Sequence, residues 1–319
     1  MALLEVKNLK TYFYTTRGIV KAVDNVNFTL EKGEVMGLAG ESGCGKSTLA
    51  YSIIRIIPPP GRIAGGQVIF DGTDLTKLPE EELNKKYRWQ RISMVFQGAM
   101  NALNPVYTVG YQLSEPLVYH KGMDKREAIE YSKKYLELVG LEPNLVKRYP
   151  HELSGGMKQR VMIAMALLLN PDLVIADEPT TALDVIVQAQ ILNLLKDLQV
   201  QLNLSIILIT HDLSIIAELA HKVAIMYAGK IVELGKSEQV FNNPRHPYTQ
   251  KLLSSIPRLR EKRRLEFIPG APPDLRAPPP GCRFHPRCPF VMDVCRREEP
   301  PMVEVEPDHH VACWLYAKR

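Results

Sequence analysis

Three short segments carry residues whose types and spacing could do phosphate chemistry. Residues 40–47 read Gly-Glu-Ser-Gly-Cys-Gly-Lys-Ser, and a Leu-Ser-Gly-Gly-Met segment follows at 153–157. A hydrophobic run then ends in Asp177-Glu178. The first segment is typical of a loop that binds nucleotide phosphates, and the last of a strand end that holds a metal ion and a water. The middle segment is useful only to a nucleotide bound by another subunit, so the triple predicts half of a composite site.

The first segment is predicted to be a phosphate-binding loop. A short apolar strand, 33–39, precedes it, and its glycines let consecutive N–H groups point inward at an anion. Lys46 would reach the β- and γ-phosphates, and Ser47 would offer Mg²⁺ a hydroxyl at the positive end of the next helix. A glycine-rich surface turn is the alternative, which the flanking strand and helix disfavour. The residues assigned to the nucleotide are Gly40, Ser42, Gly43, Cys44, Gly45, Lys46, Ser47 and Thr48.

The acidic pair ends a predicted buried parallel strand at 172–178, identified by its continuous apolar run. Two carboxylates at a buried strand end are costly unless they meet a cation. We assign Asp177 as a Mg²⁺ ligand, through water, and Glu178 as the base that polarises the attacking water. The alternative is an N-cap, since Glu178-Pro179-Thr180 could open the next helix.

With these motifs in family order across residues 1–240, the chain resembles the ATPase subunit of an ATP-binding cassette (ABC) transporter. The resemblance implies that Gln97 binds Mg²⁺ and senses a transmembrane partner, and that His211 contacts the γ-phosphate. It also implies that the loop 182–184 crosses a dimer interface. The signature residues that would cap the γ-phosphate held by the opposite subunit are Ser154, Gly155 and Gly156. A lone histidine or glutamine in such a position is usually a structural residue. The occurrence of Gln97 and His211 in the same order as in the family favours a role in the nucleotide site.

The signature residues precede a predicted amphipathic helix, 157–169, and so present N–H groups and a hydroxyl to an anion. Within one chain this second anion-binding site would be redundant, because the phosphate loop already binds the phosphates. Facing a second chain head to tail, it would close over a sandwiched ATP, and hydrolysis would break the sandwich.

An aromatic residue near the N-terminus is expected to stack on the adenine. Tyr12, Phe13 and Tyr14 are the candidates, and the distance from the strand around 22–23 favours Phe13, where many relatives carry tyrosine. Plain strand packing is the alternative for such a run of aromatics.

Composition limits the classes of protein. The chain has 319 residues, a net charge of +5 and 24% charged residues, so it carries no strong nucleic-acid signature. The basic run 258–264 is predicted to be a solvated linker. No 18-residue apolar stretch occurs, and residues 1–6 alternate like a strand rather than a signal peptide. We expect a peripheral protein on the cytoplasmic face of the membrane, with no nucleic-acid partner.

The fold class expected is α/β: an ABC-type nucleotide-binding domain over 1–240, with a P-loop RecA-like core, an antiparallel β annex and a helical subdomain at 98–157. Helices are predicted at 109–119 and 125–139. The later strands are predicted at 173–177, 205–210 and 223–227. The resemblance implies that the helical subdomain receives a cytoplasmic helix of the membrane subunit.

Residues 241–319 are predicted to form an irregular Cys/Pro-rich extension, the appendix, because twelve of the 24 prolines lie between 257 and 319. Its start, 243–249 (Asn-Pro-Arg-His-Pro-Tyr-Thr), resembles the tail of oligopeptide/dipeptide importer ATPases. That resemblance implies peptide import and a heterodimer with a second, paralogous ATPase. It also implies two transmembrane permease subunits and, indirectly, an extracytoplasmic solute-binding protein.

Four of the five cysteines lie in the appendix: Cys282, Cys288, Cys295 and Cys313. Disulfides are disfavoured in a cytoplasmic chain, so the quartet predicts a metal site. Cysteine-only ligation suits Zn²⁺ or an iron–sulfur cluster, and the lack of a Cys-x2-Cys knuckle disfavours a zinc ribbon. Resemblance to peptide-importer ATPases favours a [4Fe-4S] cluster, with Zn²⁺ and unligated or disulfide-linked thiols as alternatives.

Two classes of function follow. One is the ATP-hydrolysing subunit of a peptide importer, and the other is a soluble ABC ATPase that acts on nucleic acid or ribosomes. A single cassette, with only 106 residues and no heptad run between Ser47 and Ser154, favours the importer. The solute stays open, because some peptide-type importers carry oligosaccharides.

Overall fold

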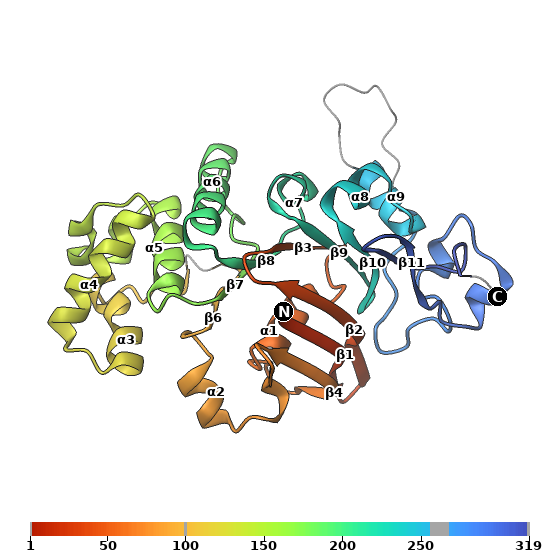
Figure 1. Cartoon of the computed structure of the whole chain (residues 1–319), viewed down its shortest axis with the longest axis horizontal. Helices are drawn as coiled ribbons and strands as arrows, with labels where there is room; N and C mark the ends of the chain where they lie inside the picture. The colour runs from red at the N-terminus through yellow and green to blue at the C-terminus, as the bar shows by residue number, and fades with distance from the viewer. Residues whose placement is uncertain (1, 99–100, 256–267, 318–319) are drawn as a thin grey trace. The chain divides into compact units, whose positions relative to one another are not determined.

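The computed structural model describes residues 2–98, 101–255 and 268–317, so the basic run predicted at 258–264 lies outside the described residues. The chain divides into two compact units. The first comprises residues 1–76 and 210–319, and the second comprises residues 77–209 (Figure 1).

The first unit contains a four-stranded antiparallel sheet in the order β2-β1-β4-β5. In β1, the buried Leu4 and Val6 lie on the same face, because side chains alternate along a strand. This sheet confirms the predicted antiparallel annex. Its strands are β1 (Ala2–Thr15), β2 (Gly18–Glu31), β4 (Gly61–Phe70) and β5 (Thr73–Asp74).

A second set of strands in this unit positions the phosphate loop. β3 (Val35–Ala39), which is buried along its whole length, pairs in parallel with β9 (Lys222–Tyr227). β9 then pairs antiparallel with β10 (Lys230–Lys236). The chain leaves β3 through residues 40–45 and enters α1 (Lys46–Ile53), which gives the strand, loop and helix order that phosphate loops require.

The appendix contains regular elements, so the prediction that it is irregular was wrong in part. Two strands, β11 (Met302–Glu306) and β12 (His309–Ala312), form a hairpin, and β12 pairs with β10. Prolines at 300, 301 and 307 flank these strands without interrupting them, and therefore remove no hydrogen bond from the hairpin. The helices of this unit after residue 210 are α7 (Leu213–Leu219), α8 (Ser237–Asn242) and α9 (Pro247–Ser254), with 3₁₀ turns at His285–Arg287 and Asp293–Arg296.

The second unit is built on three parallel strands in the order β8-β7-β6, with every residue of β7 and β8 buried. Complete burial explains their continuous apolar runs. β7 and β8, like β9 of the first unit, agree with the ranges predicted from the sequence to within a residue. The strands are β6 (Ile92–Val95), β7 (Leu173–Asp177) and β8 (Ser205–Ile209).

Helices α3, α4 and α5 lie between β6 and β7, where helices were predicted at 109–119, 125–139 and 157–169. In Figure 1, α3 and α4 lie side by side in this unit. Thr108 and Asp124 accept hydrogen bonds from the first turns of α3 and α4, which explains where these helices begin. The unit's helices are α2 (Glu80–Lys86), α3 (Val109–Lys121), α4 (Lys125–Leu138), α5 (Gly155–Leu167) and α6 (Val185–Leu202), with 3₁₀ turns at Pro143–Lys147 and Pro150–Glu152.

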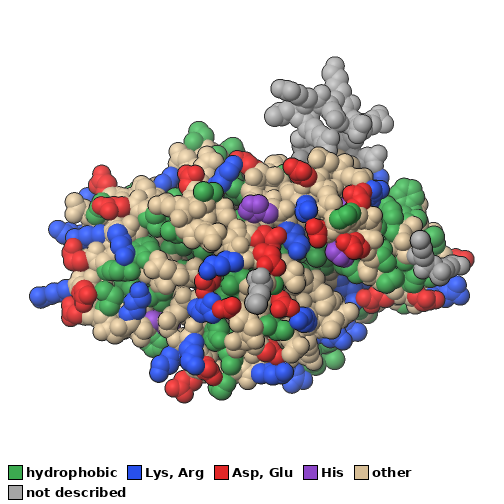
Figure 2. All heavy atoms as spheres, viewed as in Figure 1, with side chains coloured by type: hydrophobic (Ala, Val, Ile, Leu, Met, Phe, Trp, Pro, Cys, Tyr) green, Lys and Arg blue, Asp and Glu red, His purple; other side chains and the backbone are tan. Residues whose placement is uncertain are grey.

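Surface charge is mixed in sign. On the face drawn in Figure 2, Lys and Arg side chains are interspersed with Asp and Glu side chains. The net charge of +5 is therefore not gathered into one basic patch on that face. Within the described ranges, none of the helices has both the length and the apolar character needed to cross a bilayer.

Candidate functional site

The phosphate loop is packed tightly against backbone of its own unit. Gly40 and Gly45 have φ angles of 149° and 108°, in the region that favours glycine. A Cβ on Gly40 would lie 2.2 Å from the carbonyl oxygen of Met226, and one on Gly45 would lie 2.1 Å from that of Ala22. Both positions therefore require glycine, as the predicted loop does.

Lys46 lies at the centre of this loop. Its Nζ donates to the carbonyl oxygens of Gly40 at 2.8 Å and of Glu41 at 3.1 Å, and the residue is 8% exposed. Ser42 and Gly43 are exposed at the tip. Because α1 begins at Lys46, its N-terminal N–H groups belong to the same anion-binding surface.

Cys44 is a packed residue of the loop. Its thiol is buried, and burial raises its pKa despite the Lys46 ammonium, whose Nζ lies 3.7 Å from Sγ. Its N–H donates to the Glu41 carbonyl at 3.2 Å, and its own carbonyl accepts from Gly229 at 2.8 Å. Cys44 thus holds the loop shape and is separate from the four cysteines of the appendix.

The acidic pair ends β7. Asp177 is completely buried, and Glu178 follows with a left-handed φ of 48°. One oxygen of Glu178, Oε2, accepts from Gln97 Nε2 and from Thr181 Oγ1, each at 2.8 Å. The structure therefore brings together two of the predicted site residues, Gln97 and Glu178. The alternative role of Glu178 as a helix N-cap is wrong, because Asp184 caps the next helix, α6.

Ser154 is the N-cap of α5, where its Oγ accepts from the N–H of Met157 at 3.3 Å. Ser154 and Gly155 are exposed, so the hydroxyl and the first N–H groups of the helix face solvent. Gly156 packs against α6, since a Cβ there would lie 2.7 Å from Val187 Cγ1. The signature thus combines an exposed helix N-terminus with a close contact between α5 and α6.

The loop predicted to cross a dimer interface ends at Asp184, whose Oδ1 accepts from the N–H of Val187 at 2.9 Å. The next two residues, Val185 and Ile186, are 80% and 73% exposed. Two adjacent, large apolar side chains exposed at one helix end suit a surface that another subunit covers.

Two further predicted site residues, His211 and Phe13, follow or lie on strands. His211 follows β8, and the next residue, Asp212, caps α7 by accepting from Ser214 N–H at 2.9 Å. Phe13, on β1, packs against β4, since a Cβ on Gly61 would lie 2.6 Å from its ring. Stacking of Phe13 on adenine and contact of His211 with phosphate both stay predictions.

The four cysteines of the appendix line one small cavity, together with His285. Burial raises the pKa of the Cys282 thiol to about 12 and that of Cys313 to about 11, and the neighbouring cysteines add to both shifts. In the described parts of the chain, no group of three or more His, Cys, Asp or Glu residues has the arrangement of a metal site. The predicted convergence of the thiols is therefore present, whereas the geometry does not support the predicted metal.

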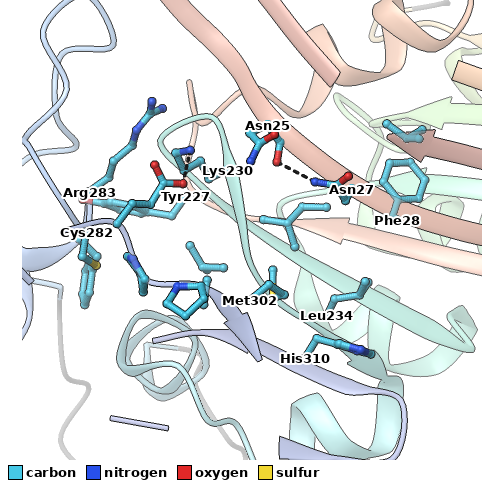
Figure 3. A pocket seen from close by; sticks show the side chains of 18 of the residues that line it. Asn25, Asn27, Phe28, Tyr227, Lys230, Leu234, Cys282, Arg283, Met302 and His310 are labelled. Carbon is cyan, nitrogen blue, oxygen red and sulfur yellow. Dashed lines mark hydrogen bonds and ion pairs between the residues drawn. The ribbon is translucent and has the colours of Figure 1, made fainter. Parts of the chain in front are cut away.

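A larger cavity of about 720 Å³ lies between β2, β10 and the appendix (Figure 3). Lys230 Nζ lies 2.5 Å from Glu299 Oε1. Arg283 pairs with Asp24 and also donates to the Ala228 carbonyl at 2.5 Å. Because these cations already have protein partners, we assign the cavity no ligand.

Sequence reasoning missed a set of contacts between the appendix and the phosphate loop. Tyr248 Oη accepts from the N–H of Glu41 at 2.8 Å. Arg287 Nη1 and Nη2 donate to the two carboxylate oxygens of Glu41 at 2.7 and 2.9 Å. Tyr248 and Arg287 are 207 and 246 positions from Glu41, so motif spacing could not connect them. The available signals were that Tyr248 lies in the segment 243–249 and that Arg287 precedes Cys288.

Comparison with known proteins identifies the family. Residues 23–181 match the family described as "ABC transporter", and residues 232–295 match "Oligopeptide/dipeptide transporter, C-terminal region". The oligopeptide transport ATP-binding protein of Escherichia coli is 50% identical over 316 residues, covering 98% of this chain and 93% of that protein. This chain belongs to the ABC transporter family. The dipeptide transport ATP-binding protein of Bacillus subtilis is 49% identical to this ABC protein over 320 residues. The match covers 99% of this chain and 95% of the Bacillus protein.

Solved structures support the cassette fold. A dimeric structure of a post-hydrolysis state of an ATP-binding cassette, bound to ADP and phosphate, is 30% identical, with a TM-score of 0.65. The match covers 73% of this chain and 98% of that cassette. The predicted α/β ABC fold is therefore confirmed, and this chain is an ATP-binding, ATP-hydrolysing ABC subunit.

Proposed function

We propose that this ABC ATPase powers the import of peptides across the cytoplasmic membrane, from a peripheral position on its cytoplasmic face. The observation that carries the proposal is the match of residues 232–295 to the oligopeptide/dipeptide C-terminal region. The cassette alone is insufficient, because one fold serves many functions. The names of the near full-length relatives support the same solute class.

Within this function we assign the cassette residues as follows. Gly40 and residues 42–48 bind the phosphates of ATP, and Ser47, Gln97 and Asp177 hold Mg²⁺. Glu178 is the base that activates water, and His211 contacts the γ-phosphate. The contact of Glu178 with Gln97 supports this assignment, because it joins the water-activating group to a metal-binding group.

We also infer the partners. The signature at Ser154 serves ATP bound by a second, paralogous ATPase, and the exposed Val185 and Ile186 lie beside the loop that would meet it. Two transmembrane permease subunits complete the transporter, and an extracytoplasmic solute-binding protein delivers the peptide to them.

Uptake of a labelled tripeptide by cells tests the function. Deleting the gene for this chain should abolish uptake, and the wild-type chain should restore it. Lys46→Ala should not restore uptake, because Lys46 lies at the centre of the phosphate loop. Pull-down of the wild-type chain should recover two integral membrane subunits.

Two outcomes would contradict peptide import. Recovery of ribosomes or nucleic acid without membrane subunits would favour a soluble ABC ATPase. Normal peptide uptake in the deletion strain, with loss of oligosaccharide uptake, would move the solute class to oligosaccharides.

We further propose that the appendix cysteines bind an inorganic group, with a [4Fe-4S] cluster as the first candidate and Zn²⁺ as the alternative. Support comes from the cavity that all four side chains line, although in the described residues they do not have the arrangement of a metal site. Such a group would link turns that bury little apolar surface by themselves, so its role here would be structural.

Metal analysis of protein purified without oxygen tests this second proposal. A cluster predicts about four irons per chain and brown colour from thiolate-to-iron absorption. Cys288→Ser and Cys313→Ser should each remove both, whereas Cys44→Ser, in the phosphate loop, should retain them. One zinc and no iron would select Zn²⁺, and the absence of both metals would reject the inorganic group.

A further inference from the structure

Glu41, in the phosphate loop, is held at three points. Its N–H donates to Tyr248 Oη at 2.8 Å, and its carbonyl accepts from Lys46 Nζ at 3.1 Å. Its carboxylate accepts from both terminal nitrogens of Arg287, at 2.7 and 2.9 Å. Two of the three partners, Tyr248 and Arg287, come from the C-terminal appendix. Part of the phosphate loop is thus fixed by residues outside the nucleotide motifs.

Arg287 uses all five of its N–H donors in this position. Nε donates to the Pro269 carbonyl at 2.8 Å, and Nη2 also donates to the Gly270 carbonyl at 3.2 Å. Nη1 also donates to Tyr227 Oη at 3.3 Å. The residue is only 7% exposed. A buried guanidinium is stable when each donor has a partner, and a planar fork matches a carboxylate in both position and angle.

The surroundings of Arg287 are densely packed aromatic side chains. The rings of Tyr227 and Tyr248 have centroids 4.6 Å apart, and Phe284 contacts both, at 5.1 and 5.4 Å. All three side chains are buried. The guanidinium and the Tyr248 hydroxyl are therefore presented to Glu41 by one packed aromatic cluster, which limits how far the loop can move.

We propose that Arg287 is a positioning residue of the ATP site, through which the appendix sets the affinity of the phosphate loop for nucleotide. Two physical effects act together. The bidentate contact keeps the loop in the shape that directs its N–H groups at phosphate, so less order has to be created on binding. Arg287 also neutralises a carboxylate that would otherwise repel a polyanion bound one residue away. The proposal requires ATP binding only and is independent of the solute.

Equilibrium binding of a fluorescent ATP analogue to the purified full-length chain, with ATP as competitor, tests the proposal. Arg287→Ala should raise the Kd for ATP about tenfold, which corresponds to the loss of one charge-assisted contact. Glu41→Gln should raise the Kd only about threefold, because this change weakens the ordering contact but also removes the charge that would repel the nucleotide. The double variant should resemble Glu41→Gln, because the two side chains are in direct contact and their effects on the Kd are therefore not additive.

Arg283→Ala is the matched control. Arg283 is also a buried arginine of the appendix, lies beside Cys282 and pairs with a cassette carboxylate, Asp24, but it makes no contact with Glu41 in the described structure. Melting temperatures should fall for both arginine variants, whereas the Kd for ATP should change only for Arg287→Ala. An unchanged Kd in Arg287→Ala, or equal weakening in Arg283→Ala, would overturn the proposal and leave Arg287 as a docking contact of the appendix.

Discussion

Glu178 illustrates how single residues combine in this site. The sequence marks it as the last carboxylate of an apolar strand and marks Gln97 as a residue after another strand, with nothing to join them. The structure joins them, because Gln97 and Thr181 both donate to Glu178 Oε2. These two hydrogen bonds hold the carboxylate in place at the end of β7, and a fixed carboxylate suits the role of a general base.

Replacement of this base gives a direct prediction. Glu178→Gln should retain ATP binding and lower ATP turnover by a factor of about 10² or more, since a neutral amide cannot accept the proton of the attacking water. The closed, ATP-bound dimer should accumulate, which gel filtration with and without ATP would detect. Glu130→Gln, an exposed carboxylate paired with Lys133, is the control and should leave turnover unchanged. Near-normal hydrolysis in Glu178→Gln would remove Glu178 from the role of base.

At the scale of elements, the sequence predicted best what local rules control. Apolar runs marked β7 and β8 to within a residue, because a strand buried on both faces is mostly apolar, and the buried polar residues Asp177 and Ser205 lie at the strand ends. The starts of α3 and α4 follow the capping residues Thr108 and Asp124. The loop and its helix were equally predictable, because glycines at 40 and 45 are required by local backbone contacts.

The appendix shows where such local rules stop. Its prolines predicted irregular structure, yet β12 pairs with β10 through residues far apart in the chain. Glu233 and His309, both fully buried, contact each other at 2.8 Å across this pairing, although they are 76 positions apart. The partner of a buried polar group depends on tertiary packing, so neither this pair nor Glu41 with Arg287 could be read from spacing.

At the scale of the whole molecule, the proposed function gives the chain halves of two different sites. Its phosphate loop would bind this chain's own nucleotide, whereas the exposed N-terminus of α5, at Ser154, would face a nucleotide held by another chain. The exposed Val185 and Ile186 add apolar surface in the same unit as this signature. An isolated chain would therefore leave binding capacity unused, which is the physical argument for assembly with a second ATPase.

The proposed heterodimer predicts that one substitution affects only one of two composite sites. Ser154→Arg replaces the small capping hydroxyl with a long cation, so the signature can no longer close on the γ-phosphate. Hydrolysis of the ATP held by the partner's phosphate loop should fall at least tenfold, a loss expected when a transition-state contact is removed. ATP binding to this chain's own loop should persist.

Single-turnover hydrolysis in assembled transporters would separate the two sites. Lys46→Ala should silence the site formed by this chain's own loop, and Ser154→Arg the other site, so the two variants should lose different fractions of the ATP consumed. Equal and complete loss in both would mean that the sites work only as a coupled pair. A purified transporter with two copies of this chain and no second type of ATPase would refute the heterodimer, because each signature would then face a phosphate loop identical to its own.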